Sequence, residues 1–121
     1  MTIGEVIGRV DTLSPNQYSN EMKIRWLTNL DGRIYEEIIK THANPLRDSF
    51  ETYAGSSAEL IVPDPYAEDL YVFYLQAMIA AQNAEDSKYE QMRVLYNEAL
   101  TAFQSWYNRN HAPRGLPRFR F

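Results

Sequence analysis

The stretch Leu70–Ala81, LYVFYLQAMIAA, is the longest apolar run of this chain, and only Gln76 interrupts it. It follows Asp64-Pro65, in which the acid suits an N-cap and the proline suits a first helical turn. A helix that is apolar on all sides must be covered on all sides. The run therefore predicts either the central helix of a bundle or a helix whose second face is covered by another subunit. It is too short to span a bilayer, which needs roughly 18–20 apolar residues.

Two helices are expected before this run. The capping box Thr2-Ile3-Gly4-Glu5 predicts a short amphipathic helix over residues 3–13. Ser19 can cap a second helix that continues to about Thr41. Its weak point is Asp31-Gly32, because glycine in a helix interior costs about 1 kcal/mol relative to alanine. We expect one continuous helix that either bends there or packs closely against a neighbour.

One more helix is expected after the run, beginning near Ser87 and ending at about Asn108. Its apolar residues recur at steps of three and four, which is typical of a helix packed between others; they are Tyr89, Met92, Tyr96, Ala99, Phe103 and Trp106. The sequence thus predicts an all-α fold, a small bundle of about four helices with one long loop over residues 43–63. The helical domain is expected over residues 1–112, and an extended C-terminal arm over residues 113–121.

Composition limits the classes of protein to which the chain can belong. Its 121 residues support one domain with a modest core, and a hydrophobic content of 45% is typical of ordered globular proteins. The chain has no cysteine, which excludes disulfides, cysteine-based zinc sites and thiol nucleophiles. The first residues lack the basic region of a signal peptide, so a soluble intracellular product without membrane association is expected.

Charge is distributed unevenly along the chain. Residues 1–98 hold eight Lys/Arg and all sixteen Asp/Glu, so their formal charge is 8 − 16 = −8. Residues 99–121 hold no acid and four arginines, which are Arg109, Arg114, Arg118 and Arg120. A body and an arm of opposite sign suit self-association, while an acidic body is a poor general binder of nucleic acid.

The sequence contains no recognisable catalytic or cofactor-binding motif. His42 and His111 are the only histidines, and neither has a metal-ligand spacing. Adjacent carboxylates such as Glu36 and Glu37 point some 100° apart on a helix, so they do not form an acid/base pair. Single scattered glycines cannot build a phosphate-binding loop. We therefore expect a protein that is not an enzyme and that needs no cofactor and no metal.

The C-terminal arm is the best candidate for a partner-binding segment. Pro113, Gly115 and Pro117 break helix, and the last four residues alternate Arg and Phe with the period of a strand. Three interpretations of the arm are open: a frayed terminus, a contact with nucleic acid, and a strand added to the exposed sheet edge of another protein. We favour the third, in which the arm is ordered only when the neighbouring protein is present. The expected contact residues are Arg109, Arg114, Leu116, Arg118, Phe119, Arg120 and Phe121. Trp106 and Tyr107 could form a subunit interface, although core packing is the alternative for Trp106.

Several segments, taken in order, resemble the head-tail connector (adaptor, or head completion) proteins of tailed bacteriophages. They include Thr2-Ile3-Gly4-Glu5-Val6-Ile7, Leu30-Asp31-Gly32-Arg33-Ile34-Tyr35, Leu60-Ile61-Val62-Pro63-Asp64-Pro65-Tyr66, Leu70-Tyr71-Val72-Phe73-Tyr74-Leu75 and Phe103-Gln104-Ser105-Trp106-Tyr107-Asn108-Arg109. The resemblance covers nearly the whole chain but involves no catalytic signature. Residues 46–57 have no counterpart that we can align with the family.

The resemblance implies a structural subunit of the virion neck, made in the host cytoplasm during assembly. Copies of the chain would form a twelve-fold ring beneath the portal protein, extend the DNA channel and dock the tail. A tail-side connector or stopper protein would bind below the ring, and double-stranded DNA would pass through without specific binding. The C-terminal segment would reach into the portal or a neighbouring subunit. The alternative from the residues themselves is a small helical nucleic-acid-binding regulator that uses the C-terminal arginines.

Overall fold

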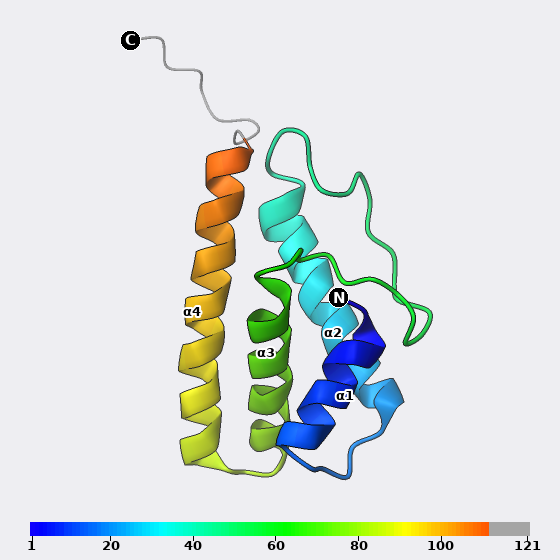
Figure 1. Cartoon of the computed structure of the whole chain (residues 1–121), viewed down its shortest axis with the longest axis vertical. Helices are drawn as coiled ribbons and strands as arrows, with labels where there is room; N and C mark the ends of the chain where they lie inside the picture. The colour runs from blue at the N-terminus through cyan, green and yellow to red at the C-terminus, as the bar shows by residue number, and fades with distance from the viewer. Residues whose placement is uncertain (112–121) are drawn as a thin grey trace.

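The computed structural model describes residues 1–111, and this part of the chain folds into helices joined by one long loop, with no sheet strand among them (Figure 1). In chain order the elements are α1 (Ile3–Leu13), α2 (Asn20–Ile34), the π-helical turn η1 (Tyr35–Ile39), α3 (Ala67–Gln82) and α4 (Asp86–Asn110). Figure 1 shows α3 and α4 side by side, with α1 and α2 crossing each other on the other side of α3. The predicted all-α class and the long loop between the second and third helices are confirmed, and the loop occupies residues 40–66.

The first helix begins at the predicted capping box. The Thr2 hydroxyl accepts a hydrogen bond of 3.2 Å from the Glu5 amide, and the Glu5 carboxylate accepts one of 2.8 Å from the Thr2 amide. The next two amides are satisfied by the long loop, since Ile3 donates to the Ala58 carbonyl and Gly4 to the Ser56 carbonyl. The loop therefore caps α1 as well as connecting α2 to α3.

The second helix is continuous through its glycine, as expected, but changes period shortly afterwards. Ser19 caps it by accepting from the Met22 amide. At its end the Lys40 amide donates to the Tyr35 carbonyl over 2.9 Å, a five-residue step that defines η1. No bend occurs at Gly32; a Cβ there would lie 3.6 Å from the Phe50 ring, so the neighbour predicted to pack there is the long loop.

The third helix is the centre of the bundle. It packs against α1, α2 and α4. Most of it is buried within this one chain, so no second subunit is needed to cover it; the buried residues are Ala67, Leu70, Tyr71, Val72, Leu75, Gln76, Ala77, Ile79 and Ala80. Of the two sequence alternatives for this helix, the central position in a bundle is the one observed.

The predicted start of the third helix is wrong by two residues. The N-cap is Tyr66 rather than Asp64, and it makes no side-chain cap hydrogen bond. The reason is a turn before the helix, in which the Tyr66 amide donates to the Pro63 carbonyl over 3.0 Å. The helical ladder then begins with the bond from the Leu70 amide to the Tyr66 carbonyl.

The fourth helix lies on one side of the bundle and contacts mainly α3. Only Phe103 and Tyr107, both near its C-terminal end, are buried. At the opposite end of the bundle, Ser14 ties three elements together, because its hydroxyl accepts from Gln76 on α3 and from Lys88 on α4. Among the helices of residues 1–111, none has the length and hydropathy needed to cross a bilayer.

Candidate partner-binding surface

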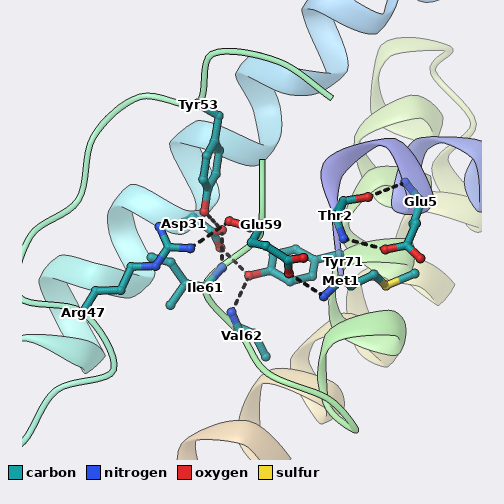
Figure 2. A network of polar contacts seen from close by, with 10 residues as sticks. All are labelled: Met1, Thr2, Glu5, Asp31, Arg47, Tyr53, Glu59, Ile61, Val62 and Tyr71. Carbon is teal, nitrogen blue, oxygen red and sulfur yellow. Dashed lines mark hydrogen bonds and ion pairs between the residues drawn. The ribbon is translucent and has the colours of Figure 1, made fainter. Parts of the chain in front are cut away.

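The long loop is held to the bundle by one buried carboxylate. Asp31 is completely buried on α2, where its two oxygens accept three hydrogen bonds (Figure 2). The Tyr53 hydroxyl and the Ile61 amide donate from the loop at 2.5 and 3.1 Å, and the Tyr71 hydroxyl donates from α3 at 2.7 Å. Tyr71 in turn accepts from the Val62 amide at 2.9 Å. The network therefore joins α2, α3 and both halves of the loop.

Burial dominates the electrostatics of this network. Removal from water raises the pKa of Asp31, while the hydrogen bonds from Tyr53, Tyr71 and Ile61 oppose the rise. Burial together with the neighbouring Asp31 carboxylate also raises the pKa of both tyrosines well above the usual range, so they remain hydroxyl donors at neutral pH. Asp31 is completely buried and its oxygens accept hydrogen bonds from three groups, so the network holds the loop against α2 and α3.

A second set of contacts fixes the loop near the N-terminus. The N-terminal ammonium of Met1 pairs with the Glu59 carboxylate at 3.2 Å, and the Arg47 guanidinium donates to the Glu59 carbonyl at 2.8 Å (Figure 2). The Leu60 amide donates to the Met1 carbonyl. Residues 46–57, which had no counterpart in the family resemblance, thus lie in a loop that is bonded to the helices at several points.

The end of α4, from which the arm leaves, is fixed to the end of α2 and η1. Tyr107 is fully buried, donates to the Ile39 carbonyl at 3.2 Å and accepts from the Leu46 amide at 3.3 Å. The His111 ring stacks on Tyr107 with centroids 4.0 Å apart, and its Nδ1 lies 3.1 Å from the Ala43 carbonyl. The chain therefore passes residue 111 at a defined place, beside the start of the long loop.

His42 supports the same junction. It is buried, its Nδ1 lies 2.7 Å from the Ile38 carbonyl, and its Nε2 lies 2.7 Å from the Asn108 side-chain oxygen on α4. The sequence placed His42 at a helix end, which is where it lies, but gave no hint of the bond to α4. No group of three or more His, Asp or Glu side chains that could hold a metal ion occurs in residues 1–111.

The predicted contact residues fall into three groups. Arg109 is exposed at the end of α4, and Trp106 is half-buried against Phe103 and Tyr66. Tyr107 belongs to the core, so in this fold it offers no surface to a neighbouring subunit. The remaining predicted residues, Arg114, Leu116, Arg118, Phe119, Arg120 and Phe121, lie outside the described residues, as does the predicted strand.

The body that carries the arm has an acidic surface. Every Asp and Glu of the chain lies in the described part, and all except Asp31 are exposed. Of the basic residues, Lys23 is buried and pairs with Asp11 at 2.7 Å, which ties α2 to α1. The uneven charge seen in the sequence is therefore a property of the folded surface.

The role of Asp31 was not predicted from the sequence, where Asp31-Gly32 indicates only a weak point of the helix. Leu27, Asp31 and Ile34 nevertheless share one helical face by their i, i+4, i+7 spacing. A carboxylate within an otherwise apolar stripe is a signal for a buried polar network. Its partners, on the other hand, lie 22 and 40 residues away, and no local pattern identifies them.

In comparisons with known proteins, no family model, no curated protein and no solved structure matches this chain.

Proposed function

We propose that the chain is a structural head-tail connector subunit of a tailed bacteriophage, which assembles as a ring under the portal and docks there through its C-terminal arm. The strongest support is the end of α4. Tyr107 and His111 attach it to η1 and to the start of the long loop, so the arm would leave every copy from the same place. A fixed starting point reduces the ordering cost when an extended segment binds a partner.

Charge supports the same function. The exposed acids of residues 1–98 give the body a negative surface, whereas the arm adds arginines and no acid. In a ring, an acidic wall would repel DNA and let it slide through, while the basic arms would be drawn to a surface of opposite sign. We infer that the partner is the portal because the sequence resembles connector proteins, which bind beneath the portal.

The proposal is tested by mixing the purified chain with the portal ring of the phage that would carry it and imaging the particles by electron microscopy. We expect an added ring at one end of the portal, with twelve copies of the chain per portal. Portal rings that remain bare at high protein concentration would overturn the assignment.

The same preparation tests the alternative regulator. Titration with duplex DNA at low and at physiological salt should give no specific complex if the chain is a connector. Tight binding to DNA that weakens steeply as salt is added would instead favour a nucleic-acid-binding protein.

A further inference from the structure

A groove runs along α2 from the end of the bundle at which the arm leaves. Two adjoining hollows of about 260 and 840 Å³ share Arg33, Glu37 and Tyr74 on their walls. The smaller one lies between η1 and α4, near Leu100 and Gln104. The larger one continues along α2, and aromatic and sulfur-containing side chains make up nearly half of its lining; they are Trp26, Tyr35, Phe50, Tyr74 and Met78.

Two carboxylates lie on the wall nearest the arm. Glu36 is exposed and pairs with Lys40 one turn later, a surface pair of little strength. Glu37 lines both hollows, and its carboxylate forms no ion pair within residues 1–111. The one cation of the groove, Arg33, lies farther along and donates to the Tyr74 hydroxyl at 3.2 Å. The groove is therefore acidic at its near end and aromatic at its far end.

The arm begins at the near end of this groove. His111 lies against the Ala43 carbonyl, and Asn108 bonds to His42, so the last described residue lies beside the start of the long loop, close to η1. Ten residues follow His111. In an extended conformation they reach up to about 33 Å, at roughly 3.3 Å per residue. From Ile39 back to Trp26 the helical rise of about 1.5 Å per residue gives roughly 20 Å, and Ala43 lies a few residues beyond Ile39, so the arm is long enough to cover the groove.

We propose that this groove is the docking site of the chain's own C-terminal segment, residues 112–121. Each residue of the arm can be matched to a position in the groove by its distance from the junction of His111 and Ala43. That distance grows by about 1.5 Å per residue along the helix and by about 3.3 Å per residue along the extended arm. Arg114 then lies opposite Glu36 and Glu37, and Leu116 lies over Tyr74, where the wall carries Arg33. Phe119 reaches Trp26 and Met78, and Phe121 lies beyond the lining residues. Acid therefore meets base at Arg114 and ring meets ring at Phe119, with no cation of the arm placed on Arg33.

The occupant is the arm of the same chain rather than that of a second copy. An arm attached at the end of its own groove has an effective concentration on the order of millimolar, far above that of any other molecule in a dilute solution. The inference concerns the free chain, so it stands or falls independently of whether the partner is a portal.

Disulfide trapping tests the proposal cleanly, because the chain contains no cysteine. One cysteine replaces Pro117, which this matching places about 20 Å along the groove. The second replaces either Asn29, an exposed residue in the groove, or Asn97, an exposed residue of α4 that does not line the groove. The two positions lie equally far along the chain from the junction of His111 and Ala43: 43 − 29 and 111 − 97 both equal 14 residues, about 21 Å where the chain is helical. We expect the Asn29→Cys chain to form an intramolecular disulfide at least about tenfold faster than the Asn97→Cys chain, in keeping with the effective concentration of a docked arm.

Neutralising the two glutamates provides a second, independent test. Adding Glu36→Gln and Glu37→Gln to the Asn29→Cys chain should slow trapping several-fold, whereas Glu98→Gln, on the far side of α4, should leave the rate unchanged. Equal rates for Asn29→Cys and Asn97→Cys would overturn the proposal. So would disulfides that form only between chains and accelerate with protein concentration, because the groove would then hold the arm of a second copy.

Discussion

The Tyr71 hydroxyl on α3 donates a 2.7 Å hydrogen bond to the Asp31 carboxylate on α2, forty residues earlier in the chain. Both side chains are completely buried. The bond joins two helices that have only a modest contact elsewhere. The same two side chains accept hydrogen bonds from the Ile61 and Val62 amides, which fixes the part of the long loop that leads into α3. The Asp31 carboxylate is therefore one of the points at which the loop is fixed to the helices.

Replacing that carboxylate should destabilise the whole fold. Asp31→Ala leaves the Ile61 amide and two tyrosine hydroxyls without an acceptor, so we expect a loss of about 3 kcal/mol or more in the free energy of unfolding. Urea denaturation followed by circular dichroism measures it. Glu98→Ala on the exposed side of α4 is the control and should change stability by no more than about 0.5 kcal/mol. A similar small loss for Asp31→Ala would show that the network is not needed.

The same residue predicts how stability depends on pH. Burial raises the pKa of Asp31 in the folded chain above its ordinary value of 3.8. The folded state therefore binds the proton more tightly than the unfolded state, and the associated stability is complete below pH 3.8 and is lost as pH rises through the folded pKa. The stability difference between the wild-type chain and Asp31→Asn should accordingly decrease from acidic toward neutral pH. A difference that increases over that range would mean a lowered pKa instead.

Glycine at the weak point of α2 is replaceable. A Cβ at Gly32 would meet the Phe50 ring at 3.6 Å, an ordinary contact distance. Gly32→Ala should therefore stabilise the chain by about 0.5–1 kcal/mol through helix propensity. Gly8→Ala is the control: nothing lies within 4 Å of a Cβ at Gly8, so this variant measures the gain in stability from helix propensity alone. If Gly32→Ala melts below the wild-type chain while Gly8→Ala melts above it, Phe50 packs more tightly on the helix than these distances indicate.

Two adjacent aromatic residues at the end of α4, Trp106 and Tyr107, differ in burial and should therefore differ in their contribution to stability. Tyr107 is fully buried and bonded to η1 and to the loop, so Tyr107→Ala should cost about 3–5 kcal/mol. Trp106 is only half-buried, and Trp106→Ala should cost clearly less. Thermal denaturation of the two variants compares them directly. Equal losses would place both side chains in the core to the same extent.

The elements that the sequence predicted well are those whose signal is local. The capping box at Thr2 marks the start of α1, and an apolar run without a polar face identifies α3 as the central helix. The start of α3 was misplaced because Asp64-Pro65 suits a helix N-terminus equally well, and only the turn from Pro63 to Tyr66 decides the position. The π-helical turn after Gly32 also lacks a sequence signature.

The candidate site was harder to predict because it depends on contacts between distant residues. The arm stands out in the sequence by its charge and its helix-breaking residues, but the attachment of His111 and Tyr107 to the loop is a product of tertiary structure. The groove along α2 combines α2, η1, α3, α4 and Phe50 of the loop, so no single segment reveals it. Periodicity predicts which face of a helix is buried, but not what lies opposite.

The central claim is that the arm, and not the helical body, binds the portal. The most direct test is to titrate the full chain and a chain ending at His111 onto an immobilised portal ring. We predict that truncation weakens binding at least about 100-fold, equivalent to roughly 2.7 kcal/mol, while the melting temperature changes by no more than about 4 °C. A truncated chain that remains folded and binds the portal with an unchanged dissociation constant would contradict the account.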